Sequence, residues 1–455
     1  MRHCGGQLNP AGATMTIITN GILLTPSGPI KGDLRIGDGR IEAIGSQHPG
    51  LPGAEVIDAS GMIVMSGFID THRHTWQTAV KGVLPSCTLD EYFAGILATL
   101  NPLYRPQDVY ISNYMGALEA LNAGITTMLD WSHISRTPEH ADAAIKGLRD
   151  SGIRAVYSHG APGSPDYWGG SSKGHPQDIR RIRKEVLSDD SQLVTLGMSA
   201  RAPGAVTDDV IKADWALARE LGLRISVHAG YRRHRHHHQH IADLARLGAL
   251  GPDTTCIHCT DSTDAELDLL AASGAFTSVA PYVEMLMGHG MPPTGKLLKR
   301  GIRPSLSIDV ASSVPGDMFT QMRTALVAER ILSMTTNPDD RFAPTLTHKD
   351  VLEFATLQGA RALGMAQTIG SLEVGKQADV VLLDTRKVNT QPVVDPEGTV
   401  VVYADTSNID TVIVRGVIRK RHGQLVASRL SVDFTLLDNS RDYLLNAAGM
   451  KRFNV

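Results

Sequence analysis

The sequence has 455 residues, of which 42% are hydrophobic and 20% are charged, and its formal net charge is −3. This length allows one large domain and a smaller one, and the composition is typical of a globular protein. The small negative charge argues against partners that bind through electrostatics, such as nucleic acid or a membrane surface. No apolar run approaches the length of a membrane span, and residues 1–6 lack the apolar core of a signal peptide.

Cysteine usage points to a reducing compartment. Cys256 and Cys259 form the single Cys-x-x-Cys pair, and without a second pair a structural zinc finger is not expected. We therefore expect reduced thiols and a cytoplasmic protein. Residues 1–14 precede a second methionine, Met15, and are predicted to be a disordered extension.

The two ends of the chain share one sequence pattern. Residues 15–66 and 366–430 both alternate short apolar runs with Gly- and Pro-containing turns, a pattern that indicates short β-strands. We predict that the two segments build one composite β-sandwich domain. Residues 431–455 are predicted to form a helical tail.

Between these segments, residues 67–365 alternate apolar strand-like runs with amphipathic helix-like runs. Eight such repeats predict an α/β fold, a (β/α)8 TIM barrel whose active site lies at the carboxyl ends of its strands. The predicted strands are 63–70, 125–131, 153–158, 193–199, 223–228, 254–258, 275–280 and 303–309. The predicted helices are 107–122, 138–150, 207–222, 239–249, 263–273 and 293–300.

The chain is organised around residues 67–74, Gly-Phe-Ile-Asp-Thr-His-Arg-His. This stretch follows the apolar run 62–65 and is predicted to end a buried strand. Side chains two residues apart on a strand point the same way, so His72 and His74 should project together. Neutral imidazoles placed in this way suit a divalent ion such as zinc. Gly67 would let the backbone approach its neighbours closely.

Three more potential ligands follow predicted strands. His228, His258 and Asp309 come at the ends of strands 223–228, 254–258 and 303–309. Each alone could be a structural side chain. Because the carboxyl ends of barrel strands share one mouth, these residues and the first two histidines predict a single metal site.

These segments resemble the amidohydrolase superfamily, in the branch of enzymes similar to cytosine deaminase and triazine hydrolase. The resemblance covers nearly the whole chain. It rests on segments 67–74, 227–229, 257–259, 355–364 and 370–379, and on Asp309.

The resemblance implies a role for each residue. His72, His74, His228 and Asp309 would bind one Zn²⁺ or Fe²⁺. His258 would polarise a water activated by the metal, and Asp309 would accept its proton. Relatives with two metals carry a bridging carboxylated lysine after the fourth strand, and residues 193–200 contain no lysine, so one metal is expected. The family also implies a homo-oligomer, either a dimer or a tetramer.

One position departs from the family pattern. Deaminases of this branch place a glutamate three residues after the histidine of the fifth strand, where it shuttles a proton, and this chain has Tyr231 there. A tyrosine with a pKa near 10 is a poor substitute. We predict that Glu284 supplies the missing proton shuttle, with His289 as the weaker candidate. The competing interpretations are that Glu284 only forms a hydrogen bond with a metal ligand, or that it is a loop carboxylate in water.

The residues predicted to contact the substrate are Trp76, Gln77, Tyr231, His133 and His159. Trp76 could stack on a flat ring, and core packing is an equally good interpretation. Either histidine could be structural. The run 232–240, rich in histidine and arginine, is expected to be a solvated loop, with a lid or an anion site as alternatives.

Together these features predict a mononuclear metal-dependent hydrolase that acts on a carbon–nitrogen bond of a small nitrogen heterocycle, amide or amidine. The resemblance implies that it is a deaminase. The small molecule would be its only partner apart from other copies of the chain. The first alternative is hydrolysis of another leaving group, such as chloride or an alkylamine, or ring opening or cyclisation. The second is a catalytically silent scaffold.

Overall fold

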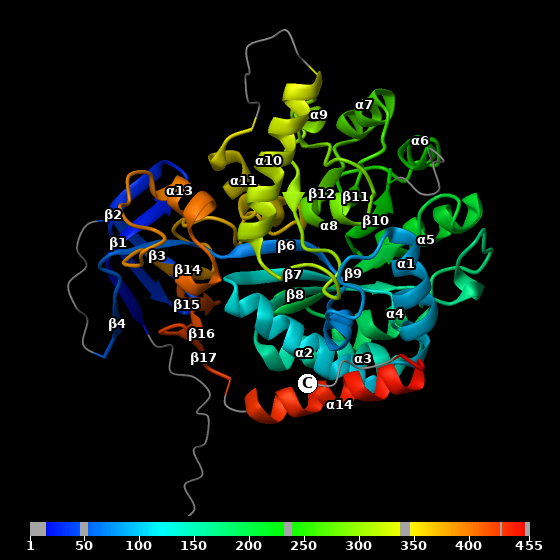
Figure 1. Ribbon diagram of the computed structural model, residues 1–455, viewed down its shortest axis with the longest axis horizontal. Coiled ribbons are helices and arrows are strands. Elements are labelled where there is room, and N and C mark those ends of the chain that lie inside the picture. The colour runs from blue at the N-terminus through cyan, green and yellow to red at the C-terminus, as the bar shows by residue number, and fades with distance from the viewer. Residues whose placement is uncertain (1–14, 46–52, 232–238, 337–345, 428–429, 451–455) are drawn as a thin grey trace, which may run out of the picture.

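The computed structural model describes residues 15–45, 53–231, 239–336, 346–427 and 430–450. A barrel surrounded by helices stands beside a nine-stranded sheet built from both ends of the chain (Figure 1). The predicted residues 1–14 and most of the run 232–240 lie outside the described residues. The architecture agrees with the predicted (β/α)8 TIM barrel and its companion β-structure. The predicted domain boundaries at 66 and 366 stay predictions.

The barrel consists of eight parallel strands in sequence order. Nearly all of their residues are buried, as expected for strands covered by helices on one side and by the barrel interior on the other. The strands are β6 (Phe68–Arg73), β7 (Ile125–Ser132), β8 (Arg154–Gly160), β9 (Val194–Ala200), β10 (Ile225–Ala229), β11 (Thr254–His258), β12 (Phe276–Val279) and β13 (Ser305–Leu306).

The barrel closes between β13 and β6 through residues that follow the short β13. The amide of Asp309 donates to the carbonyl of His72 at 2.9 Å, and the amide of His74 donates to the carbonyl of Asp309 at 2.8 Å. Asp309 therefore forms an isolated bridge with Arg73. The predicted strand 303–309 is thus regular only at Ser305–Leu306, yet its last residue is held by backbone hydrogen bonds to His72, in β6, and to His74, which follows that strand.

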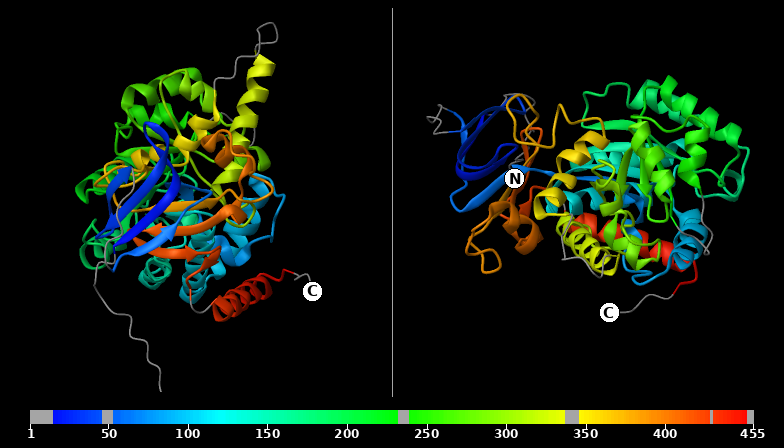
Figure 2. Two further views of the ribbon diagram at one scale, coloured as in Figure 1. Left: turned by 90° about the vertical axis from the view of Figure 1, so that its left-hand side faces the viewer. Right: turned by 90° about the horizontal axis from the view of Figure 1, so that it is seen from above.

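Helices follow the strands and surround the barrel (Figure 2). The predicted helices overlap α2, α3, α5, α6, α7 and α9. The α-helices are α1 (Leu89–Tyr92), α2 (Pro106–Asn122), α3 (Pro138–Ser151), α4 (Asp178–Arg181), α5 (Asp208–Glu220), α6 (His240–Arg246), α7 (Asp264–Ser273), α8 (Pro281–Leu286), α9 (Thr294–Leu298), α10 (Met318–Thr336), α11 (His348–Phe354), α12 (Leu357–Ala362), α13 (Pro396–Gly398) and α14 (Leu430–Ala447). Shorter 3₁₀ or π segments are η1 (Thr75–Val80), η2 (Phe93–Leu100), η3 (Asn101–Leu103), η4 (Pro165–Tyr167), η5 (Ile182–Val186), η6 (Thr399–Tyr403) and η7 (Thr406–Asn408).

The second sheet joins the two ends of the chain. Its two halves meet where β5 pairs antiparallel with β14, and its inner face encloses a separate hydrophobic cluster. The strands are β1 (Thr16–Thr25), β2 (Gly28–Gly37), β3 (Arg40–Gly45), β4 (Glu55–Asp58), β5 (Met62–Ser66), β14 (Val380–Asp384), β15 (Ile409–Val414), β16 (Val417–Arg421) and β17 (Gln424–Leu425).

Gly67 separates this sheet from the barrel. The sequence predicts one strand over 63–70, but the structure divides it, because β5 pairs within the terminal sheet and β6 pairs with β7. A Cβ atom on Gly67 would lie 2.1 Å from Oγ1 of Thr126. The structure therefore confirms the prediction that residue 67 must be a glycine because its backbone lies close to a neighbouring strand.

The helix α14 lies along the outside of α2 (Figure 1). Ser440 donates a hydrogen bond to the buried carboxylate of Asp108 at 2.7 Å, and the guanidinium of Arg105 stacks on the ring of Tyr443. Among the described residues, no helix is both long and apolar enough to cross a bilayer. Cys87, Cys256 and Cys259 are buried free thiols.

Candidate metal centre

Five side chains converge at the carboxyl mouth of the barrel. His72 and His228 lie one residue before the ends of β6 and β10, and His258 is the last residue of β11. His74 directly follows β6, and Asp309 comes three residues after β13. Nε2 of His72 lies 3.0 Å from Oδ1 of Asp309, and Nε2 of His74 lies 3.2 Å from the same oxygen. The sequence predicted this convergence, and the structure brings all five side chains together.

Their donor atoms suit a divalent cation. Nε2 of His228 lies 3.1 Å from Nε2 of His72. One donor atom from each of His72, His228, His258 and Asp309 lies within 4.8 Å of all the others. Imidazole nitrogens and a carboxylate at this spacing are a ligand set that zinc accepts.

Trp131, the penultimate residue of β7, fixes the orientation of these imidazoles. Its carbonyl oxygen lies 3.0 Å from Nδ1 of His74 and favours the tautomer in which Nδ1 carries the proton. In that tautomer Nε2 of His74 is free to bind a metal ion. Its indole ring packs against His228, His74 and His72, with ring centroids 4.5, 5.4 and 6.1 Å apart. Such neighbours hold metal ligands in one rotamer.

Burial sets the charge of the site. It lowers the pKa of His72 to about 4 and the pKa of His228 well below the ordinary value, so both imidazoles are neutral at pH 7. Burial alone would raise the pKa of Asp309, but its hydrogen bonds to His72 and His74 hold that pKa well below the ordinary range. Neutral imidazoles and an ionised carboxylate are the forms that bind metal.

Two residues of the centre have left-handed backbone conformations. His258 has φ +77° and Asp309 has φ +70°, a region that residues other than glycine seldom adopt. Such conformations cost on the order of 1–3 kcal/mol each and occur often at functional sites. Here they turn the side chains at the strand ends toward the shared mouth.

Glu284, in α8, lies behind His258. Nδ1 of His258 donates to Oε1 of Glu284 at 3.1 Å, and the same oxygen accepts the amide of Ala280 at 2.8 Å. Nε2 of His258 therefore faces Oδ2 of Asp309, 3.7 Å away. Burial opposes the charged form of His258, but the hydrogen bond that it donates to Glu284 and the charge of Asp309 raise its pKa.

The centre opens into a cavity of about 530 Å³. His74, His228, His258 and Asp309 contribute to its wall. Most of the remaining wall is apolar or aromatic, as in many sites for small molecules. Its large side chains include Tyr92, Phe93, Leu97, Trp131, Trp168 and Met287.

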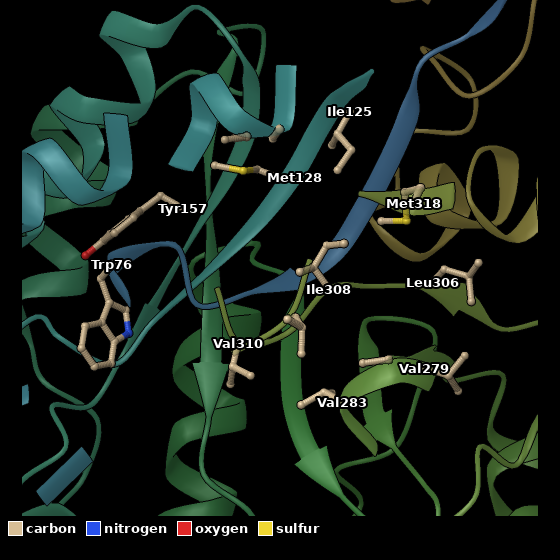
Figure 3. Packing of buried hydrophobic residues seen from close by; sticks show 14 of the residues in the cluster. Trp76, Ile125, Met128, Tyr157, Val279, Val283, Leu306, Ile308, Val310 and Met318 are labelled. Carbon is tan, nitrogen blue, oxygen red and sulfur yellow. The ribbon is translucent and has the colours of Figure 1, made fainter. Parts of the chain in front are cut away.

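Of the residues predicted to contact substrate, His133 and Tyr231 lie at the cavity wall. Trp76 does not: its ring is fully buried against Tyr104 and His133, within the core cluster of Figure 3. The interpretation of Trp76 as a stacking platform is therefore replaced by core packing.

Gln77 and His159 also lie away from the wall. The amide of Gln77 donates to the hydroxyl of Tyr92 at 2.6 Å and accepts from Ser312 at 3.0 Å, so it supports a wall residue from behind. His159 is buried, and its Nδ1 lies 2.9 Å from Nε2 of His175. Both satisfy buried hydrogen bonds in place of the predicted contact with substrate.

The two predicted proton carriers occupy different places. Glu284 is fully buried and is not part of the wall, whereas His289 is. The cavity wall also includes residues that the sequence did not single out as substrate contacts, among them Phe93, Trp168 and His240. They come from loops and short helices, whose approach to the barrel mouth has no periodic signal in the sequence.

The family model of the amidohydrolase family matches residues 63–419, which is most of the chain. The chain belongs to the amidohydrolase family. This match includes all five residues of the candidate centre.

Two curated relatives of this amidohydrolase are deaminases. A 5'-deoxyadenosine deaminase of Methanothermobacter thermautotrophicus is 30% identical over 419 residues, which cover 90% of this chain and 94% of the relative. A 5-methylthioadenosine/S-adenosylhomocysteine deaminase of Moorella thermoacetica is 28% identical over 413 residues, which cover 88% and 92%.

Solved structures share the fold of this amidohydrolase. An adenosine deaminase from Xanthomonas campestris, with bound zinc, aligns with a TM-score of 0.83 at 22% identity and covers 95% of this chain and 98% of its own. An atrazine chlorohydrolase from Arthrobacter aurescens, in complex with zinc, aligns with a TM-score of 0.81 at 20% identity and covers 94% and 100%.

Proposed function

We propose that this amidohydrolase is a mononuclear metal-dependent deaminase of an amino-substituted nitrogen heterocycle. The observation that carries the proposal is the convergence of His72, His74, His228 and Asp309, the last three of which line a mostly apolar cavity. The deaminases named among its relatives support the reaction.

We propose Zn²⁺ as the metal, with Fe²⁺ as the alternative. Three imidazoles and one carboxylate form the proposed ligand set, and the zinc in the two solved structures supports this choice. Strand β9 (Val194–Ala200) offers no lysine for a bridge to a second ion. The bound metal would supply a Lewis acid and lower the pKa of water.

Each polar residue then has a distinct task. Asp309, next to His72 and His74, would accept the proton of the attacking water. His258, with Nε2 turned toward Asp309, would stabilise the negative charge that develops on the substrate. Glu284 would hold the proton on Nδ1 of His258, so we assign it a positioning role in place of the proton-shuttle role.

The cavity suits a planar ring with an apolar substituent. Trp131 and Trp168 present aromatic surface, and His133 and Tyr231 add polar groups that can orient a heterocycle. We therefore propose purine-type substrates such as those named for the relatives.

A second candidate is hydrolysis of another leaving group, such as chloride. Tyr231 favours it, because this position lacks the carboxylate with which deaminases protonate departing ammonia, and chloride departs without a proton. The shared fold of the atrazine chlorohydrolase is compatible with this candidate.

We also propose that the chain forms a homo-oligomer, a dimer or a tetramer, in the cytoplasm. Val327, Ile331 and Met334 are exposed on α10 at the spacing of one helix face, with 57%, 50% and 63% of their surface accessible. Light scattering of the purified protein tests the oligomer.

The function is tested by ammonia release from the zinc-loaded full chain. A suitable panel contains 5'-deoxyadenosine, 5'-methylthioadenosine, cytosine and amino-triazines, each beside its chloro analogue. We expect ammonia from at least one compound and loss of this activity in Asp309→Ala. Chloride release without any ammonia release would favour the second candidate, and no release of either would remove both.

A further inference from the structure

His289 is a buried side chain with unused hydrogen-bonding capacity. It contributes to the cavity wall, and only 4% of the residue is exposed. Within the part of the chain that the structure describes, neither Nδ1 nor Nε2 has a hydrogen-bond partner. A buried polar group without a hydrogen bond is costly, so this side chain is expected to bind a partner that enters the cavity.

The backbone holds His289 at this place. Gly288 and Gly290 flank it with φ of +78° and +131°, and a Cβ atom on Gly290 would lie 3.1 Å from Cβ of Thr260. The hydroxyl of Thr260 donates to the carbonyl of His289 at 2.7 Å. Gly290 lets this loop pack against the loop after β11, and the imidazole is thereby held at the wall.

His289 also lies close to the reaction centre. Its ring meets the ring of His258 edge-on, with centroids 4.7 Å apart, and lies 6.2 Å from the ring of Tyr231. Tyr231 stands where related deaminases have their glutamate. His289 therefore approaches the same region of the cavity from the opposite loop.

We propose that His289 is a catalytic residue that carries the proton to the departing nitrogen in place of that glutamate. This inference rests on the proposed deaminase function. A neutral imidazole has one donor and one acceptor nitrogen, so it can take up a proton at one and deliver a proton from the other.

The atoms and electrons of the reaction then balance. The oxygen of water bonds to the ring carbon, and one proton of the water ends on the adjacent ring nitrogen. The other proton passes from Asp309 through His289 to the amino group. The carbon–nitrogen bond breaks, its electron pair stays with nitrogen, and ammonia leaves while the carbon becomes a carbonyl.

The leaving group provides the test, because chloride departs without a proton. We would compare ammonia release from 5'-deoxyadenosine with chloride release from its 6-chloro analogue, and likewise an amino-triazine with its chloro analogue. The proteins are the zinc-loaded wild type and His289→Gln, with His289→Asn as a second variant in case the first does not fold. Zinc content and the circular dichroism spectrum verify each protein.

We expect His289→Gln to lower kcat for ammonia release about 100-fold or more while chloride release falls less than about tenfold. Equal losses for both leaving groups, or unchanged ammonia release, would overturn the role of His289 and leave the proposed function intact. Release of chloride but not ammonia by the wild type would overturn both this role and deamination. Release of neither would remove the proposed function itself and this inference with it.

Discussion

Nδ1 of His258 and Oε1 of Glu284 are joined by a buried hydrogen bond of 3.1 Å. The carboxylate is itself held by the amide of Ala280, so the pair is a fixed support for the imidazole that faces Asp309. Residues that orient active-site histidines in this way contribute strongly to activity although they do not touch substrate.

Glu284→Gln should lower kcat by about 10–100-fold, because the neutral amide holds the proton on Nδ1 of His258 more weakly. KM and zinc content should change little, since the metal ligands keep their places. Steady-state kinetics and elemental analysis provide the measurement. Glu139→Gln, at an exposed position of α3, is the matched control. Undiminished turnover in Glu284→Gln with full zinc would contradict the positioning role.

Removal of single residues should separate the metal ligands from the residue that acts on substrate. Asp309→Ala should reduce zinc well below the value of about one per chain expected for the wild type, because Asp309 is the proposed anionic ligand. His258→Ala should keep most of the zinc and lose activity. Elemental analysis of untagged protein measures both, and two metals per wild-type chain would contradict the mononuclear assignment.

The sequence predicted the parts of this site that depend on periodicity. His72 and His74 share a side because strand residues two apart do so, and His228, His258 and Asp309 meet them because parallel strands end at one mouth. These inferences need the order of the strands and no knowledge of loops.

The remaining contacts depend on packing that sequence patterns do not encode. Trp76 follows the metal pair, but the turn η1 directs its ring into the core. Glu284 was correctly placed near the site, yet its direction toward His258 follows from the start of α8 at Pro281. The left-handed backbone conformations of His258 and Asp309 could not be predicted, because neither residue is a glycine.

The buried side chain of His159 should make the free energy of unfolding depend on pH. Burial lowers its pKa from 6.5 to about 4, so below pH 6.5 the unfolded chain binds a proton that the folded protein does not. The free energy of unfolding must therefore fall as the pH drops from 6.5 toward 4, by about 3 kcal/mol at most for this residue. His159→Gln should make that decrease shallower.

Urea unfolding of chelator-treated protein at several pH values measures this slope, since zinc release then makes no contribution. His422→Asn is the control, because 79% of that side chain is exposed on the terminal sheet. It should leave the slope unchanged. Equal slopes in His159→Gln and the wild type would show that His159 does not contribute to the acid sensitivity.

Tyr231 offers a way to restore the proton carrier that the family pattern would place there. Its ring lies 6.2 Å from the rings of both His258 and His289. A glutamate introduced into this mostly apolar wall would have a raised pKa, which suits it to give and take a proton near pH 7.

The double variant His289→Gln/Tyr231→Glu should therefore release ammonia at least about tenfold faster than His289→Gln alone. His289→Gln/Tyr231→Gln has nearly the same shape but cannot carry a proton, and it should show no recovery. Equal rates in the two double variants would mean that ammonia leaves this site without a proton carrier at either position.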